Sequence, residues 1–368
     1  MKLSIARSTL LGMLQKVIGV VENRQTLPIL ANVLIRCADN RFSLTASDLE
    51  MELTAETELP LSDGSERFAF TAAARKLLEI CQSLADGCTV NLHLDGDKLR
   101  LHSDKASFSL ATLPADNFPK FEVPAIEDRI LVDSAKLRRT IDQSRFAMAL
   151  QDVRFYLNGL LLDVEGDMLR LVSADGHRLA YAEQRLDSTV TARRQMILPR
   201  KGVVELHRLL GSFTGDVEIG IGGNTLRALL GNAVFSVKLI DATYPDYRRL
   251  IPSDLSRTIM VDKGALKQSL GSVSVLCHEK FKNVRFDFSP GLLSLSATNS
   301  ENEEASDVVD INFDGVPLLT AYNGSYIMEA LNHCDGDKVL FGIDDRGVCV
   351  IEAETDAGSR FVVMPLRT

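Results

Sequence analysis

Long apolar runs are absent from this sequence. No window of about 18 residues is both apolar and uncharged, which is close to the minimum length of a membrane-spanning helix. The first twenty residues are interrupted by Arg7 and Lys16 and lack the layout of a secretory signal peptide. We therefore expect a cytoplasmic protein that makes no use of a membrane.

Paired metal ligands and paired cysteines are also missing. The six cysteines are scattered without a CxxC pair, and the six histidines are dispersed without an HExxH motif. This usage favours reduced cysteines that serve as small apolar residues, rather than a disulfide or zinc framework. We expect no metal and no cofactor.

Catalytic motifs are weak. Ser173, Asp175 and His177 lie too close together along one stretch to form a triad, and no nucleophile elbow is present, so we favour a turn at Asp175–Gly176. The GIGGN stretch (220–224) lies between two expected strands, which predicts a hairpin rather than a phosphate loop. The acidic run 301–307 lacks the glycine and spacing of a calcium loop, so we expect a solvated or interface loop.

The sequence does contain a threefold repeat of about 125 residues. Leu44, Leu171 and Leu295 occupy equivalent positions, 127 and 124 residues apart. Each repeat contains two helical patterns, each followed by alternating strands. We predict an α+β fold of three similar domains, each a duplicated β-α-β-β-β unit with largely antiparallel sheets. The expected domains are 1–124, 125–252 and 253–368, with boundaries near Pro124 and Pro252.

Positive charge is concentrated in the predicted helices. The six stretches 8–24, 71–84, 134–149, 199–211, 262–276 and 323–333 together carry a net charge of +7, although the whole chain carries −9. Helix starts are expected near the capping candidates Ser8, Ser134 and Asp262. Solvated helix faces would explain the charge of any single helix. The segregation of charge over five of them favours a basic surface for a polyanion.

Three functional classes follow from these patterns. The favoured one is a non-catalytic DNA-encircling protein, and the alternatives are a DNA-acting hydrolase or transferase and a cytosolic scaffold that binds peptides without DNA. Two partly basic apolar stretches, 244–250 and 361–368, suggest a binding surface. A frayed tail is the alternative for Met364, Pro365 and Leu366.

Several motifs resemble the bacterial sliding clamp family, the beta subunit of DNA polymerase III. They are QDVRFYLNG (151–159), ADGHRLA (174–180), YPDYRRL (244–250) and VVMPLR (362–367), with TLPIL (26–30) and EKF (279–281) in support. The resemblance covers the whole chain. It implies a head-to-tail homodimer whose six domains close into a ring, with the helices lining a hole for duplex DNA and the sheets outside.

The resemblance implies a dimer contact between the first and third domains. Phe108 and Leu110 on an edge strand (107–113) would meet Val275 and Leu276 of the other subunit. Glu301, Glu303 and Glu304 would face Lys76. Such a contact would supply the main-chain hydrogen bonds that an isolated edge strand leaves open.

The implied DNA contact is modest and independent of sequence, because tight phosphate binding would oppose sliding. The family match suggests Arg24, Gln151 and Tyr156 as DNA-facing residues. The helix charge adds Arg75, Lys136, Arg139, Lys201 and Lys267.

The family also implies a cleft between the second and third domains for short linear peptides. Its partners would be the alpha and clamp-loader subunits of DNA polymerase III, other polymerases and repair proteins. The matching residues are Arg154, Leu157, Ala174, Gly176, His177, Arg178, Leu179, Pro245, Arg249, Leu250, Val362, Met364, Pro365, Leu366 and Arg367. Ala174 replaces a common Thr and Thr368 a common Leu, which could change peptide preference. The protein would be grouped with polymerases only by association.

Overall fold

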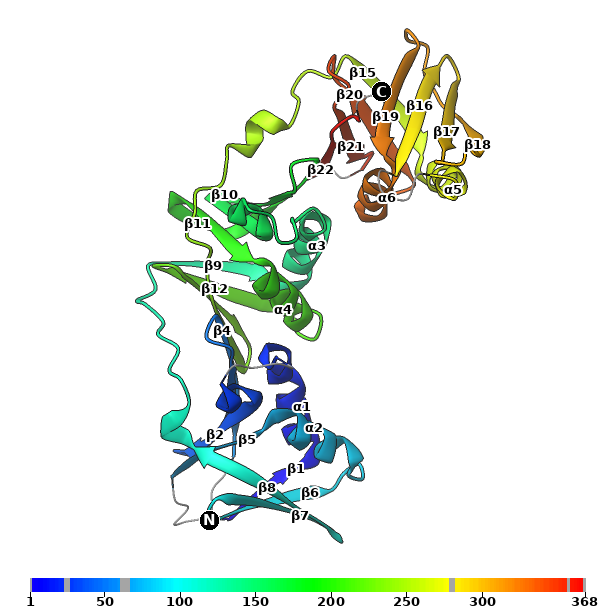
Figure 1. The fold of residues 1–368 in the computed structure, drawn as a ribbon. Coiled ribbons are helices and arrows are strands. Elements are labelled where there is room, and N and C mark those ends of the chain that lie inside the picture. The colour runs from blue at the N-terminus through cyan, green and yellow to red at the C-terminus, as the bar shows by residue number, and fades with distance from the viewer. Residues whose placement is uncertain (1, 23–26, 60–66, 278–281, 356–357, 367–368) are drawn as a thin grey trace. The chain divides into compact units, whose positions relative to one another are not determined.

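The computed structural model describes residues 2–22, 27–59, 67–277, 282–355 and 358–366. Within these ranges all six predicted helices are present (Figure 1). They are α1 (Arg7–Val17), α2 (Ala74–Ser83), α3 (Ser134–Arg145), α4 (Arg200–Leu210), α5 (Lys263–Ser274) and α6 (Gly324–His333). The first is shorter than predicted, because a 3₁₀ turn (Ile18–Val20) follows Val17.

The predicted helix caps have mixed outcomes. Asp262 caps α5, since its carboxylate accepts a 2.7 Å hydrogen bond from the backbone N–H of Ala265. The prediction that Ser8 caps the first helix is wrong, because α1 begins at Arg7 and its N-cap residue, Ala6, forms no side-chain cap. The hydroxyl of Ser134 donates to the carbonyl of Phe213. Side-chain caps therefore form at only some of the expected helix starts.

The chain forms two compact units, residues 1–135 with 204–239 and residues 136–203 with 240–368. The predicted middle domain thus contributes to both units. The physical reason is that its strands extend sheets which begin in the predicted first and third domains.

The first unit contains a twelve-stranded antiparallel sheet. In spatial order its strands are β1 (Lys2–Ala6), β6 (Thr89–Asp95), β7 (Lys98–Ser103), β8 (Ala106–Pro114), β5 (Phe68–Ala73), β2 (Asn32–Ala38), β3 (Arg41–Ser47), β4 (Met51–Glu58), β14 (Ala233–Lys238), β13 (Thr225–Leu230), β12 (Asp216–Gly222) and β9 (Asp128–Asp133). Gly222 pairs with Thr225, so the predicted GIGGN hairpin is confirmed. Pairing of β4 with β14 carries the sheet across the predicted first boundary.

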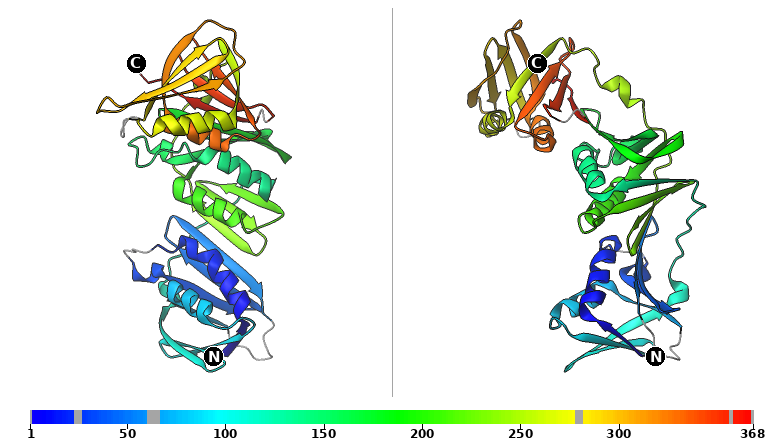
Figure 2. Two further views of the ribbon diagram at one scale, coloured as in Figure 1. Left: turned by 90° about the vertical axis from the view of Figure 1, so that its right-hand side faces the viewer. Right: turned by 180° about the vertical axis from the view of Figure 1, so that it is seen from behind.

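Helices α1 and α2 pack against each other, and α1 also packs against β3 and β4 (Figure 2). Leu10, Leu14 and Val17 on α1 are fully buried, as is Leu77 on α2. These residues form the apolar stripe that the helical spacing predicts.

The second unit contains two antiparallel sheets. The six-stranded sheet has the order β10 (Gly159–Ala174), β11 (Arg178–Pro199), β22 (Ser359–Val363), β21 (Cys349–Ala353), β20 (Lys338–Ile343), β15 (Arg257–Asp262). The four-stranded sheet has the order β18 (Glu304–Asp310), β17 (Leu292–Thr298), β16 (Asn283–Ser289), β19 (Leu318–Asn323).

Two predictions for this unit need correction. Residues 159–174, where the repeat predicts two separate strands, form the single strand β10, whose pairing with β11 is irregular around Gly166, a residue with φ of 61°. The acidic run is only partly a loop, because Glu304 begins the edge strand β18. Alternation of Ala305, Asp307 and Val309 with more exposed residues is what an edge strand with one packed face requires.

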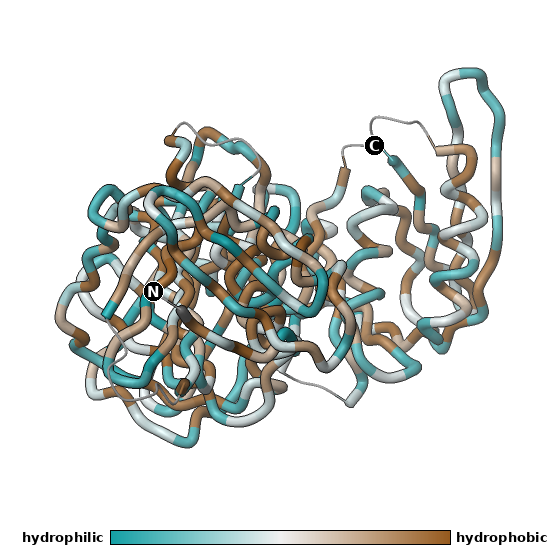
Figure 3. The backbone as a smooth tube through the Cα atoms, turned by 90° about the horizontal axis from the view of Figure 1, so that it is seen from below, coloured by the Kyte–Doolittle hydropathy of each residue, from teal (hydrophilic) through white to brown (hydrophobic). Residues whose placement is uncertain are grey.

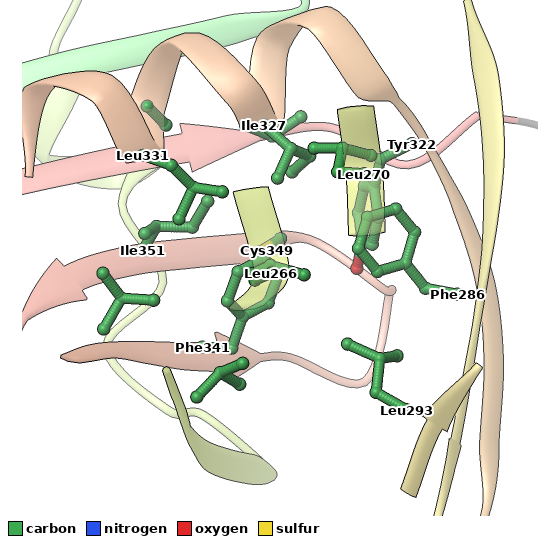
Figure 4. Packing of buried hydrophobic residues seen from close by; sticks show 14 of the residues in the cluster. Leu266, Leu270, Phe286, Leu293, Tyr322, Ile327, Leu331, Phe341, Cys349 and Ile351 are labelled. Carbon is green, nitrogen blue, oxygen red and sulfur yellow. The ribbon is translucent and has the colours of Figure 1, made fainter. Parts of the chain in front are cut away.

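Helices α5 and α6 cover an apolar core in the second unit (Figure 4). Leu266 and Leu270 of α5 and Ile327 of α6 meet aromatic rings from the strands, including Phe286 and Phe341. Apolar and polar residues are interleaved along the chain (Figure 3), and no helix in the described part is long and apolar enough to cross a bilayer.

Candidate functional site

A tight turn between β10 and β11 forms one edge of the candidate site. The carboxylate of Asp175 accepts hydrogen bonds from the backbone N–H groups of His177 and Arg178, at 2.9 and 3.0 Å. Gly176 has φ of 89°, a conformation that favours glycine. The predicted Asp175–Gly176 turn is therefore confirmed, while Ser173 is buried and donates to the carbonyl of Ser144.

Arg154 packs directly over this turn. Its guanidinium binds both carboxylate oxygens of Asp152, at 3.0 and 2.9 Å, and reaches the carbonyl of Asp175 at 3.3 Å. Hydrogen bonds from Arg154 lower the pKa of Asp152 to about 2, so the pair stays charged at neutral pH. A Cβ added to Gly176 would lie 2.8 Å from the Arg154 Nη2, so only glycine allows this approach.

Arg178 is too buried to contact a ligand at the surface. Its side chain is 11% exposed and forms ion pairs with Asp175 and Glu329. The guanidinium also donates to the carbonyl of Phe146 and stacks on the ring of Tyr326, 4.4 Å from its centroid. Arg178 therefore joins the predicted second and third domains beneath the site.

The C-terminal segment is anchored next to the turn. Strand β22 pairs with β11, placing Leu179 opposite Val362. Beyond the strand, the N–H of Met364 donates to the carbonyl of His177 at 2.9 Å, and that of Leu366 to Ala321 at 2.8 Å. A frayed tail is thus wrong for Met364–Leu366, and the Met364 side chain is still 42% exposed.

The segment 244–250 forms another part of the candidate site. Tyr244 and Tyr247 are buried, and a 3₁₀ turn (Tyr247–Leu250) exposes Arg249 and Leu250. Pro245 is exposed as well, and Arg249 forms an ion pair with Asp246 at 3.1 Å. Buried tyrosines thus hold a turn whose remaining side chains face solvent.

Asp163 fixes Tyr247 in place. Its carboxylate has no solvent exposure and binds Arg193 through two hydrogen bonds, at 2.8 and 2.7 Å. It also accepts a 2.7 Å hydrogen bond from the hydroxyl of Tyr247. Burial alone would raise the pKa of Asp163, but these hydrogen bonds outweigh it and the pKa is lowered. Burial, followed by the bond to Asp163, raises the pKa of Tyr247 to about 12.

Below these edges lies a continuous apolar cluster. Leu157, Ala174, Leu179 and Val362 belong to it. Tyr244 and Tyr247 pack with them, as do Val348 and Val350. The candidate residues Leu157, Ala174, Leu179 and Val362 therefore share one apolar floor in the second unit with Tyr244 and Tyr247. Leu250 and Met364, three and two residues along the chain from members of this floor, have exposed side chains. Arg367 lies outside the described residues.

The arrangement suits a short peptide with apolar anchors. The exposed apolar side chains of this site can pack against apolar side chains of the peptide. Arg154, His177 and Arg249 offer it polar contacts at the rim. In the described part of the chain, no cluster of three or more His, Cys, Asp or Glu side chains could hold a metal ion.

The candidate DNA-facing residues differ in their surroundings. Arg75, Lys136 and Lys201 are exposed, and Lys267 is half-buried. Arg139 binds Asp335 at 3.1 and 2.5 Å, and the buried side chain of Gln143 binds the same carboxylate. The side-chain amide of Gln143 donates to this carboxylate at 3.0 Å, although Asp335 itself is half exposed.

Gln151 is exposed and has φ of 56°. Tyr156 is half-buried, with its ring 6.1 Å from that of Tyr244, next to the apolar cluster. Arg24 lies outside the described residues. The two described family-derived candidates therefore belong to the same unit as the peptide-site residues.

The candidate dimer-contact residues come from both units and are exposed or half-buried. Phe108 and Leu110 are half-buried on β8, and Lys76 is exposed on α2. Val275 is 79% exposed just after α5, and Leu276 is half-buried. Glu301 and Glu303 precede β18 and Glu304 begins it, and all three are exposed.

Sequence reasoning missed Asp163, Arg193 and Glu329. A buried carboxylate at a strand position that should be apolar was the available signal for Asp163. Its partners lie 30 and 84 residues away, so no local pattern could identify them. Glu329 is 151 residues from Arg178, and its role depends entirely on how the two predicted domains pack.

Known proteins share this architecture over the full chain. Family models described as the N-terminal, central and C-terminal domains of the DNA polymerase III beta subunit match residues 1–122, 131–246 and 248–367. The chain is 39% identical over 368 residues to the beta sliding clamp of Vibrio cholerae and 38% identical to that of Escherichia coli K12, each covering 100% of both chains.

Solved structures agree. A DNA polymerase sliding clamp from Pseudomonas aeruginosa has a TM-score of 0.97 at 38% identity, and the pol III beta of Caulobacter crescentus has 0.94 at 34%, both over 100% of each chain. The three-domain clamp fold is therefore confirmed. The curated relatives are named as clamps and not as polymerases. The chain belongs to the family of the DNA polymerase III beta subunit, the non-catalytic DNA sliding clamps that act as processivity factors.

Proposed function

We propose that two copies of this chain close head to tail into a ring around duplex DNA and tether replication and repair proteins through the site described above. The observation that carries the proposal is the match of the whole chain, three domains in order, to sliding clamps. The domains run from 1 to 124, 125 to 252 and 253 to 368, and the ring works in the cytoplasm, where bacterial DNA is replicated.

Two edge strands support the dimer contact. Residues Ala106–Ala111 of β8 pair with β7 on one side, and among the described residues no strand pairs with their other side. Strand β18 likewise ends its sheet. In the proposed ring these edges meet, Phe108 and Leu110 pack on Val275 and Leu276, and Lys76 faces Glu301, Glu303 and Glu304. Burial of such an apolar pair contributes roughly 2–4 kcal/mol.

The DNA contact is electrostatic and weak in this proposal. Exposed Arg75, Lys136 and Lys201, together with Lys267 and Gln151, attract the phosphate backbone without reading bases. Arg139 contributes less, because Asp335 already neutralises it. Tyr156 contributes less as well, because it is half-buried next to Tyr244.

The peptide site serves the alpha and clamp-loader subunits of DNA polymerase III, other polymerases and repair proteins. The exposed apolar side chains of Leu250 and Met364, together with the buried apolar floor, support this role. Arg178 acts as a support, since its charge is already paired.

Product length on a singly primed circular template tests the proposal. With the cognate polymerase and clamp loader, addition of this chain should lengthen the products made in one binding event. Unchanged product length in the presence of an active loader would contradict the proposed function.

A further inference from the structure

A cavity of roughly 530 Å³ lies in the first unit, away from the site described above. Strands β2, β3 and β4 form one wall, and the chain that follows β8 covers it. The lining consists of Leu34, Arg36, Ser43, Thr45, Glu52, Thr54, Glu56, Ala115, Asp116, Phe118, Pro119, Lys120 and Phe121.

The strand pairing shows that this cavity occupies the position in the first unit that corresponds to the candidate peptide site in the second unit. We call the pairing of β4 with β14 the first junction and the pairing of β11 with β22 the second junction. Glu52 of β4 pairs with Ser236 of β14, as Leu179 of β11 pairs with Val362 of β22. Thr45 pairs with Thr54, as Val172 pairs with Tyr181. The partners at the two junctions are 126 or 127 residues apart, which is the spacing of the repeat.

The covering segments correspond as well. Phe118–Pro119 occupies the place of Tyr244–Pro245, and both aromatic residues are 6% exposed. Phe118 packs on Leu34, Ile29 and Leu30, which anchors the segment. The same backbone framework therefore appears at both junctions.

The chemistry of the two sites differs. The apolar floor residues Leu179, Val172 and Val362 are replaced by Glu52, Thr45 and Ser236. Thr54 replaces the larger Tyr181, which leaves open space where the second unit has a packed cluster. An apolar peptide anchor would have to bury Glu52 there, so this cavity is unsuited to the peptides of the candidate site.

Glu52 is half-buried, and no described residue forms a hydrogen bond or ion pair with it in this structure. Burial raises its pKa to about 7, although the charges of Arg36 and Arg227 lower it. The other charged groups that face this region are Glu56 on β4, Lys238 on β14, and Asp116 and Lys120 on the covering segment. The two arginines thus leave the carboxylate incompletely stabilised, and a directly bonded donor would stabilise it.

We propose that this cavity binds an extended peptide segment that presents an arginine or lysine side chain to the carboxylate of Glu52. Three carboxylates and two cationic side chains line the cavity, and Thr45, Thr54 and Ser43 offer further hydrogen bonds. The site is separate from the proposed peptide site, so either can fail without the other.

N-acetyl-arginine amide is a suitable probe, with the uncharged N-acetyl-citrulline amide as its matched analogue and N-acetyl-glutamate amide as the anionic one. Methyl NMR signals of Leu34, Thr45 and Thr54 in the full-length protein report binding. The arginine probe should bind at least about tenfold more tightly than citrulline amide, because its positive charge strengthens hydrogen bonds that the neutral ureido group of citrulline can also donate. Equal binding, preference for the glutamate probe or no saturable shift would overturn the proposal.

Two variants test whether Glu52 is the residue that causes the preference for the arginine probe. Glu52→Gln keeps the shape of the side chain and should abolish the preference for arginine over citrulline. Glu50→Gln is the control, because Glu50 is exposed, pairs with Lys238 at 3.6 Å and does not line the cavity. Thermal unfolding of both variants verifies folding, and an unchanged arginine preference in folded Glu52→Gln would overturn the proposal.

The pH dependence gives an independent check. Ionised Glu52 binds the cation, so affinity for the arginine probe should rise as pH increases through about 7 and then level off. Folded Glu52→Gln should show no such rise. A wild-type affinity that is flat through neutral pH would contradict the role of Glu52.

Discussion

The hydroxyl of Tyr247 donates a 2.7 Å hydrogen bond to the carboxylate of Asp163, a side chain with no solvent exposure. This bond joins β10 to the segment that carries Pro245, Arg249 and Leu250. Arg193 neutralises the same carboxylate. The position of one edge of the candidate peptide site therefore depends on a buried charged group on a neighbouring strand.

Replacement of Asp163 by Asn should lower the free energy of unfolding by about 3 kcal/mol at neutral pH, because Arg193 loses its charged partner. The folded-state pKa of Asp163 is depressed, so its stabilisation is present above the unfolded-state value near 4 and is lost as pH falls through the folded-state pKa. Denaturant unfolding of both proteins over a pH series measures this.

The difference between wild type and Asp163→Asn should therefore shrink at strongly acidic pH. A constant difference across the whole series would show that the ionised carboxylate is not the stabilising group. Tyr247→Phe is a milder companion variant, since it removes one hydrogen bond and leaves Arg193 paired; its expected cost is about 1 kcal/mol.

Gly176→Ala should cost about 1–2 kcal/mol of stability, because Gly176 has φ of 89° and a Cβ would lie 2.8 Å from Arg154. The displaced Arg154 should also weaken peptide binding, measured by fluorescence anisotropy with a labelled partner peptide. Gly12→Ala on α1 is the control, since no atom lies within 4 Å of its added Cβ. Equal behaviour of the two variants would contradict the packing of Arg154 over the turn.

Deletion of residues Met364–Thr368 should abolish binding of the same peptide while the dimer persists. Met364→Ala tests the contribution of the side chain alone, because the backbone N–H at position 364 can still donate to the carbonyl of His177. We expect it to weaken binding about tenfold or more through loss of apolar contact. Full affinity in both variants would exclude this segment from the site.

Leu276→Asp should convert the proposed dimer into monomers, because an unpaired charge would enter an apolar contact. Sedimentation equilibrium distinguishes a monomer of 40.5 kDa from a particle of twice that mass. Leu319→Asp is the control, since Leu319 is 52% exposed on β19, at the opposite end of the sheet from β18. A Leu276→Asp protein that still sediments as a dimer would exclude this contact.

Much of the fold follows from local sequence patterns. Hydrophobic spacing places all six described helices, Asp262 caps α5, and the glycine pair in GIGGN predicts the hairpin between β12 and β13. Each of these features depends on residues close together in the chain, which is why a single sequence contains enough information.

Tertiary packing accounts for what sequence could not predict. Gln143 is buried and bonded to Asp335, 192 residues away, and Arg178 is withdrawn from the surface by Glu329 and Phe146. Glu304 begins a strand only because β17 offers a partner. The family resemblance placed the peptide-site residues in one region, but it did not identify Asp163 and Arg193, which hold that region together.

Retention on DNA tests the central claim most directly. After loading onto a nicked circular plasmid, the chain should stay bound through gel filtration at moderate salt and be released when a restriction enzyme linearises the circle. Equal retention on circular and linear DNA, or loss from both despite an active loader, would contradict a ring that holds DNA by encirclement.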